Sequence, residues 1–416
     1  MLPLSKASTR IGIAAGIVAI LGTGVAAYLF FTRSFPSSKG MPVAIIEDCG
    51  GFLVNEPQAH SLNKTALDDR EKADLQKKIE CYRFQVSQEP NFADAYTNIG
   101  EAYRRLGDLE KGREFNQKAL KLNPRLQEAR LGMALVEQES GNFKAAIGAI
   151  QEVIAHKESA IAYFYQGITF YKQGNLKDAQ AAFGKAIDLD PNYAEAHANL
   201  GLTLNQQGKL PEAIEQTRQA LRIHPDLTEA QYNLGVALQA QGQLKEAIAA
   251  YKEVIRINPN HAEANYNLGI ALRNQGQTSE AIAAYREVIR IDPKSATAHI
   301  SLGTNLTDEG KLEEAIAELK KGLSLNPEDA EAYNNLGVAL YKQNDVAKAM
   351  SMWSEAIRIN PNYAEAHHNL GVALASQVKV EESIATLKQA SDLYRAQGNT
   401  QKADKIDRVL QNVGVQ

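Results

Sequence analysis

The sequence has few of the residues that mark a disulfide scaffold, a metal site or a highly charged binding surface. Its 416 residues include only two cysteines, Cys49 and Cys81, and one tryptophan. Two cysteines are too few for a disulfide framework, and their spacing matches no zinc pattern. The formal net charge is −4, with acidic and basic residues alternating along the chain and no basic stripe. Because nucleic-acid-binding proteins usually carry such a stripe, we expect no nucleic-acid partner.

Catalytic signatures are also missing from the sequence. It contains no P-loop and no nucleophile elbow. His197, His299 and His367 fall on different predicted helices, too far apart to share one metal ion, so each is interpreted as a core or groove residue. The chain is therefore predicted to have no cofactor, no metal and no enzymatic activity of its own.

One long apolar run lies near the N-terminus. Residues 11–31 contain 21 residues without a charge, long enough for a helix to cross the roughly 30 Å hydrocarbon core of a bilayer. We predict that residues 1–32 are a single-pass signal anchor and that residues 11–31 contact lipid. The alternative is a cleaved signal peptide, whose apolar region is normally about 7–15 residues and ends at a small-x-small site. Bulky residues at the end of this run favour the anchor.

Flanking charges give a weak indication of orientation. Lys6 and Arg10 precede the run, whereas Arg33 and Lys39 are followed by acidic residues. The positive-inside rule then favours a cytoplasmic N-terminus, with the remaining domain extracytoplasmic, in a periplasm or lumen. In an oxidising compartment Cys49 and Cys81 would form a disulfide; otherwise they are two free thiols. Both interpretations stay open.

The rest of the chain begins with a connector and a lone helix. Residues 33–64 are rich in serine, proline and glycine and are predicted to be a linker. Residues 65–92 are predicted to hold one lead-in helix, because Leu75, Ile79, Tyr82 and Val86 recur at three- and four-residue spacing.

A repeat dominates everything after this helix. Two sets of residues recur every 34 positions, apart from one shortened repeat near residue 158 that lacks its proline. The prolines are Pro90, Pro124, Pro191, Pro225, Pro259, Pro293, Pro327 and Pro361. The glycines are Gly100, Gly167, Gly201, Gly235, Gly269, Gly303, Gly337 and Gly371.

One unit, residues 262–293, shows what the repeat encodes. Ala264, Leu268 and their neighbours make the apolar stripe of a first helix, which ends at Gly276. A second apolar stripe includes Tyr285 and ends before Pro293, because the residue before proline resists helical backbone angles. Each unit is thus predicted to be two antiparallel helices that bury their faces by stacking on neighbouring units.

The pattern resembles the tetratricopeptide repeat family. The resemblance rests on Asn267-Leu268-Gly269 in the first helix, Glu280-Ala281-Ile282 in the second and Asp292-Pro293 at the end, together with the 34-residue period. It implies an all-α, right-handed superhelical solenoid of about nine repeats over residues 93–393, with a capping helix and tail in residues 394–416. It also implies a concave groove lined by the first helices.

An asparagine series marks that expected groove. Asparagine is a mediocre helix former, yet it recurs at one first-helix position in six repeats. The series comprises Asn98, Asn199, Asn233, Asn267, Asn335 and Asn369. One interpretation is consensus packing through local hydrogen bonds. The other is a ladder of amides that binds the backbone of an extended peptide, edged by Tyr232, Val236, Tyr266 and Ile270. On this second view, alanine at these asparagines should leave the fold intact.

These features predict a membrane-anchored protein-interaction scaffold that binds partner polypeptides in its groove and assembles or recruits a membrane or envelope complex. The alternatives are a non-catalytic subunit of an enzyme complex and, if the leader is cleaved, a secreted binding protein. The sequence does not predict the oligomeric state or the identity of the partner.

Overall fold

A computed structural model describes Cys49, Leu67 and residues 69–412 of the chain. The chain divides into two units, Met1–Ile45 and Ile46–Gln416, and every described residue belongs to the second unit. The predicted membrane segment, residues 11–31, and all of the predicted linker except Cys49 lie outside the described residues. Within the described part, no helix is both long enough and apolar enough to cross a membrane.

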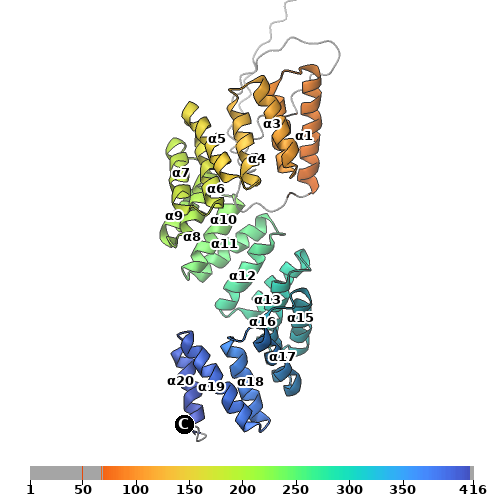
Figure 1. The fold of residues 1–416 in the computed structure, drawn as a ribbon, viewed down its shortest axis with the longest axis vertical. Coiled ribbons are helices and arrows are strands. Elements are labelled where there is room, and N and C mark those ends of the chain that lie inside the picture. Colours follow the sequence, from red (N-terminus) through yellow and green to blue (C-terminus); the bar gives the residue numbers. More distant parts are fainter. Residues whose placement is uncertain (1–48, 50–66, 68, 413–416) are drawn as a thin grey trace, which may run out of the picture. The chain divides into compact units, whose positions relative to one another are not determined.

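The described residues fold into helices that follow one another in chain order (Figure 1). A lead-in helix, α1 (Asp69–Gln88), is followed by nine helix pairs and a final helix, α20 (Thr400–Asn412). The first helices of the pairs are α2 (Ala93–Arg105), α4 (Gln127–Glu139), α6 (Ala160–Lys172), α8 (Ala194–Gln206), α10 (Thr228–Ala240), α12 (Ala262–Asn274), α14 (Ala296–Asp308), α16 (Ala330–Lys342) and α18 (Ala364–Ser376). The second helices are α3 (Leu109–Leu122), α5 (Phe143–His156), α7 (Leu176–Leu189), α9 (Leu210–Ile223), α11 (Leu244–Ile257), α13 (Thr278–Ile291), α15 (Leu312–Leu325), α17 (Val346–Ile359) and α19 (Val380–Ala396).

The sequence explains where each helix begins and ends. In the sixth pair, Gly276 takes a φ of 82° and closes the turn between α12 and α13. Asp292 leaves the helical region with φ −128° and ψ 91°, as expected for a residue that precedes a proline. The all-α repeat architecture predicted from the 34-residue period is confirmed over the described residues.

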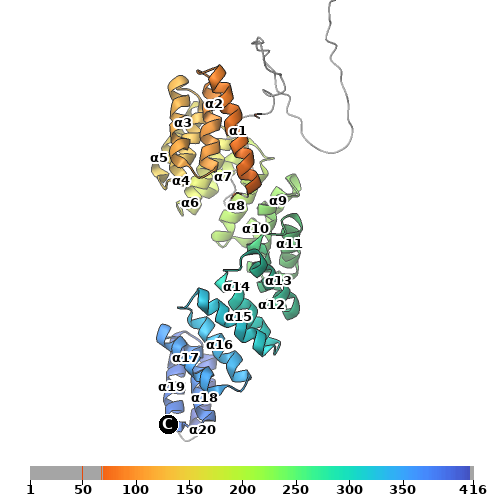
Figure 2. The same cartoon turned by 90° about the vertical axis from the view of Figure 1, so that its right-hand side faces the viewer.

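First helices form one face of the stack. Each helix packs against the next in the chain, and first helices of neighbouring pairs also touch directly, as α8 touches α10 and α14 touches α16 (Figure 2). Neighbouring second helices make no contact of similar extent within the described part. We call the face formed by the first helices, where successive pairs approach most closely, the inner face.

Large side chains from the second helices fill the space between the two helices of a pair. Tyr251, Tyr285 and Trp353 are 0%, 2% and 2% exposed, which confirms that the predicted apolar stripe with Tyr285 faces the core. Each lies against the glycine of its partner first helix. A Cβ added to Gly269 would lie only 2.6 Å from Cε1 of Tyr285, so glycine is needed where the two helices approach.

The two ends of the stack are formed by α1 and by α19 with α20. Helix α1 buries Leu75, Ile79 and Tyr82, as the spacing of these residues predicted. At the other end α19 is 17 residues long, whereas the other second helices have 14, and it runs to Ala396. The last helix pair therefore extends beyond residue 393, and α20 alone forms the predicted C-terminal cap.

Candidate peptide-binding groove

The predicted groove residues all lie on first helices and so belong to the inner face. Tyr232 and Val236 lie on α10, and Tyr266 and Ile270 lie on α12. All four are half-buried and pack against the edge of the main hydrophobic core. They therefore combine a fixed position with surface that remains accessible, which is the property required of groove walls.

The asparagine amides connect successive first helices. Nδ2 of Asn267 donates to the Tyr232 hydroxyl at 2.9 Å, and Nδ2 of Asn369 donates to Oδ1 of Asn334 at 2.9 Å. Asn335 similarly reaches the Thr304 hydroxyl of the preceding first helix at 3.1 Å. The seventh repeat carries Ser301 at this position, and its hydroxyl lies 3.3 Å from the hydroxyl of Tyr266.

The remaining asparagines vary in their contacts. Asn233 donates to the Ala198 carbonyl oxygen over a long 3.5 Å, whereas Asn199 donates to the Glu195 carbonyl of its own helix at 2.8 Å. Asn98 is 5% exposed on α2. The series is therefore brought onto one face, and most of its amide nitrogens already donate one hydrogen bond within the fold.

The amide oxygens of the series differ in their contacts: Oδ1 of Asn335 accepts a hydrogen bond from Nδ2 of Asn334 at 3.4 Å. Within the described residues, no donor is hydrogen-bonded to Oδ1 of Asn267 or of Asn369. Both side chains are half-buried, and an amide oxygen can accept two hydrogen bonds. Each amide nitrogen also carries a second N–H group, so a peptide bound along this row could use both the donors and the acceptors of the amides.

A buried charge cluster, which the sequence analysis did not predict, lies on the inner face of the first two pairs. Arg104 is 5% exposed; it bonds Glu101 at 2.6 Å and also contacts Glu139 of α4. Arg105 binds the same Glu101 at 3.0 Å. Burial alone would lower the pKa of Arg104, but the two carboxylates outweigh it and hold this pKa above its usual range. The cluster links α2 to α4 through the almost fully buried charge of Arg104.

The histidines are bonded within single helix pairs. Nδ1 of His299 lies 2.6 Å from Glu318, and Nδ1 of His197 lies 2.8 Å from Gln216. In each ring Nε2 faces a proline carbonyl, that of Pro293 or Pro191. These contacts tie a first helix to its second helix and to the preceding loop, which gives the two histidines a role in packing.

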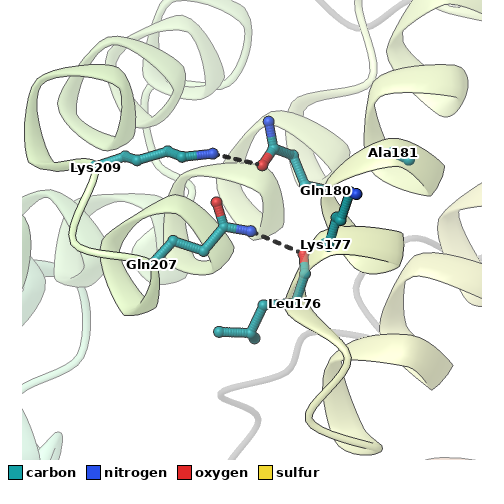
Figure 3. Close-up of a pocket in the computed structure, with 6 residues that line it drawn as sticks. All are labelled: Leu176, Lys177, Gln180, Ala181, Gln207 and Lys209. Carbon is teal, nitrogen blue, oxygen red and sulfur yellow. Dashed lines mark hydrogen bonds between the residues drawn. The ribbon is translucent and has the colours of Figure 1, made fainter.

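An open hollow lies between α7 and the turn that joins α8 to α9 (Figure 3). Its volume is about 720 Å³. Nζ of Lys209 donates to Oε1 of Gln180 at 3.0 Å, and Nε2 of Gln207 donates to the Leu176 carbonyl oxygen at 2.9 Å. These bonds join the two repeats across the hollow, so the polar groups that line it already contribute to repeat stacking.

The two cysteines lie beside the first repeat. Cys49 and Cys81 form a disulfide, with their Cα atoms 5.8 Å apart. Cys49 is buried in a cluster with Leu75, Ile79 and Tyr82, and the Tyr82 hydroxyl donates to the Cys49 carbonyl oxygen. The disulfide thus attaches one residue of the preceding segment to the lead-in helix.

An all-α stack of helix pairs with an accessible inner face defines a class of repeat proteins that act as interaction scaffolds. Models of the tetratricopeptide repeat match residues 93–126, 131–179, 166–228 and 232–296, and a further TPR repeat model matches residues 305–344 and 339–378. The chain therefore belongs to the tetratricopeptide repeat family, as the sequence pattern predicted.

Several solved structures resemble the chain. YrrB, described as a TPR protein with an unusual peptide-binding site, is 25% identical; the match covers 45% of this chain and 97% of YrrB, with a TM-score of 0.42. MamA is 26% identical over 40% of this chain and 96% of its own, with a TM-score of 0.38. A tetratricopeptide repeat protein from Parabacteroides merdae is 20% identical over 60% of this chain and 99% of its own, with a TM-score of 0.49. No curated relative matches the chain.

Proposed function

We propose that the chain captures partner polypeptides along its inner face and so brings them together at a membrane. The observation that carries this proposal is the periodic row of amides and half-buried apolar side chains on successive first helices, such as Asn267 and Ile270 on α12. A periodic row fits a ligand that is itself periodic, and the backbone of an extended peptide presents an N–H group at regular intervals.

The chemistry of the row favours a mainly apolar peptide. Tyr232, Val236, Tyr266 and Ile270 offer apolar surface, and the amide oxygens accept hydrogen bonds from a backbone. One such bond contributes only about 0.5–1.5 kcal/mol net, so several repeats must act together. Affinity would then depend on the length of peptide engaged and fall steeply when the ligand is shortened.

Attachment to a membrane is a separate part of the proposal. Residues 11–31 form an uncharged run long enough to cross a bilayer, and we propose that they anchor the chain with its repeats on the extracytoplasmic side. The Cys49–Cys81 disulfide supports this side, because disulfides persist in oxidising compartments. A tethered scaffold of this kind would assemble or recruit a membrane or envelope complex.

Crosslinking in native membranes, followed by affinity purification, tests the groove. The variant Val236→Glu/Ile270→Glu places two carboxylates on the apolar wall, and we expect recovery of crosslinked partners to fall at least tenfold. Leu189→Glu is the matched control, because Leu189 is an apolar residue that is 44% exposed on the second helix α7. Circular dichroism establishes whether each variant keeps its helices, and Val236→Thr/Ile270→Thr is a milder version of the same change.

Two results would count against the proposal. If the folded double variant captures the same partners with unchanged recovery, the inner face is not the binding surface. If carbonate washing releases the full-length chain from membranes, or if only a shortened soluble form is found, residues 11–31 do not act as an anchor.

A further inference from the structure

The inner face ends in a pocket beside the last helix pair. Helix α20 packs on α19 as the first helix of a tenth repeat would, but it does not pack closely against α18. The space between α18, α19 and α20 is a cavity of about 430 Å³. That volume lies within the range of roughly 300–1,000 Å³ typical of ligand pockets.

The walls of this pocket include apolar surface that is left uncovered. Val372 of α18 is 42% exposed, whereas Val236 and Ile270 at the same position of earlier repeats are half-buried. Val409 of α20 lines the same pocket and is 56% exposed. Ile406, which is 5% exposed, provides a packed floor. Two exposed valines that line one cavity from different helices form a slot for an apolar side chain.

The rim of the pocket carries an excess of positive charge. Nζ of Lys402 lies 2.7 Å from Oε1 of Glu365 and 4.9 Å from the centre of the Tyr394 ring, so this bridge neutralises the one carboxylate in the lining. Lys405 also lines the pocket, and within the described residues it has no ion-pair partner. The unmatched ammonium beside an apolar slot is complementary to a carboxylate that accompanies an apolar group.

From this geometry we infer that the pocket between α18 and α20 binds an apolar side chain of a partner peptide together with an adjacent carboxylate. Val372 and Val409 would contact the side chain, and Lys405 would pair with the carboxylate. The inference rests on the proposed function, because the pocket would hold one end of a peptide that lies along the inner face. The carboxylate is either the C-terminus of the partner or a neighbouring acidic side chain.

Fluorescence anisotropy with the full-length protein in detergent micelles tests the pocket directly. The probes are fluorescein-labelled hexapeptides with a Ser-Gly-Ser-Gly-Ser leader. One ends in leucine with a free carboxylate, a second ends in leucine amide, and a third ends in alanine with a free carboxylate. A fourth, longer by one residue, ends in Leu-Glu amide and so offers only a side-chain carboxylate. We expect the free leucine probe, the Leu-Glu probe or both to bind at least fivefold more tightly than leucine amide and the alanine probe.

Matched variants assign the binding to the pocket. Val409→Ser and Lys405→Ala should each weaken binding at least fivefold, and raising the salt concentration should weaken it as well. Val380→Ser controls for the valine, since Val380 is 55% exposed and does not line the pocket. Lys320→Ala, on the exposed surface of the second helix α15, controls for the lysine.

Several outcomes would overturn the inference. The pocket is not a peptide site if no leucine probe shows saturable binding, or if the pocket variants and their controls behave alike. Binding that appears only after removal of residues 413–416 would make the chain's own tail the occupant. These failures are distinct from failure of the proposed function, because crosslinked capture that is lost in Val236→Glu/Ile270→Glu would still place binding on the inner face.

Discussion

The side-chain amide of Asn267 donates a hydrogen bond to the hydroxyl of Tyr232, 35 residues earlier in the chain, with 2.9 Å between Nδ2 and Oη. The bond joins the first helices of two successive repeats, α10 and α12, at the surface proposed to bind peptide. The same amide thus joins two repeats and, in the proposed function, would offer its oxygen to a ligand. Stability and binding at this position are therefore linked and must be measured separately.

A double-mutant cycle measures the structural part of this bond. We expect Asn267→Ala and Tyr232→Phe to show a coupling energy of about 0.5–1.5 kcal/mol in urea unfolding, the usual net value of one hydrogen bond. Asn274→Ala, at the exposed end of the same helix, should show no coupling to Tyr232→Phe. Coupling no larger than that control would mean that the bond does not contribute to repeat stacking.

Removing the Tyr251 hydroxyl should have the opposite effect on stability from removing the Tyr232 hydroxyl. It is buried with no hydrogen-bond partner among the described residues, so the folded protein bears the cost of removing it from water. Tyr251→Phe should therefore raise the free energy of unfolding by about 1 kcal/mol at neutral pH, whereas Tyr232→Phe should lower it. An unchanged or lower stability of Tyr251→Phe would show that the hydroxyl has a partner in solution.

The same residue predicts a pH dependence. Burial raises the pKa of Tyr251 well above its ordinary value of 10.0, so the hydroxyl loses its proton more readily in the unfolded chain than in the folded one. The unfolded state then binds fewer protons above pH 10, and stability falls as the pH rises further. Urea unfolding between pH 9 and 11 should show a smaller loss for Tyr251→Phe than for the unmodified protein.

Substitution of Gly269 tests whether the two helices of a pair approach too closely for a larger side chain. Its added Cβ would lie 2.6 Å from Cε1 of Tyr285, and overpacking of this kind typically costs about 1–3 kcal/mol. Alanine regains up to about 1 kcal/mol as a better helix former, so Gly269→Ala should be destabilising by about 1 kcal/mol overall. Gly148→Ala on α5 is the control: no atom lies within 4 Å of its added Cβ, and it should be stabilising. Similar unfolding midpoints for the two variants would contradict this account of the glycine.

Much of the fold could be predicted because the same local sequence signals recur in most of the repeats. The prolines, the turn glycines and the apolar stripes recur together, so they identify the helix pairs and core positions such as that of Tyr285. The sequence of a single repeat predicts its helix boundaries only weakly, since these boundaries also depend on the neighbouring repeats. Helix α19 has three extra residues because Arg395 occupies the position at which most repeats carry the proline that ends the second helix.

The contacts between repeats were harder to predict. The low helix propensity of asparagine indicated a special role, but the expectation that alanine leaves the fold intact overlooked the bonds to Tyr232, Thr304 and Asn334. These bonds join residues 31 or 35 positions apart. Pairing each asparagine with residues of the preceding repeat would have revealed them. The charge cluster of Arg104 and Glu101 was missed because it occurs once and does not repeat.

Reduction of the Cys49–Cys81 disulfide should loosen the first repeat. The two cysteines are 32 residues apart, and the chain-entropy model gives a loop of this length a stabilisation of about 3–4 kcal/mol. We expect a reductant to increase hydrogen exchange in α1 and α2 while the central repeats stay protected, since repeat proteins couple mainly to nearest neighbours. The variant Cys49→Ser/Cys81→Ser should show the same increase and no response to reductant. Equal protection of α1 with and without reductant would show that the disulfide does not stabilise this end.

Val378 shows that helix packing, and not the residue itself, determines the backbone of the turn between the two helices of a pair. It occupies the position at which Gly276 closes the turn of the sixth pair, and it adopts a φ of 61° although β-branched residues avoid this region. Its side chain is 83% exposed, so replacing it removes almost no packing. For a residue other than glycine, the left-handed region lowers the stability of the fold by about 1–2 kcal/mol. Glycine avoids this cost but is more flexible in the unfolded chain, which offsets part of the gain. Val378→Gly should therefore raise the free energy of unfolding by about 1 kcal/mol. Hydrogen exchange of α18 and α19 should slow accordingly, whereas the reverse change Gly276→Val should accelerate exchange in α12 and α13. If Val378→Gly leaves exchange unchanged or accelerates it, the valine is not strained, and its exposed side chain would have to contribute to stability.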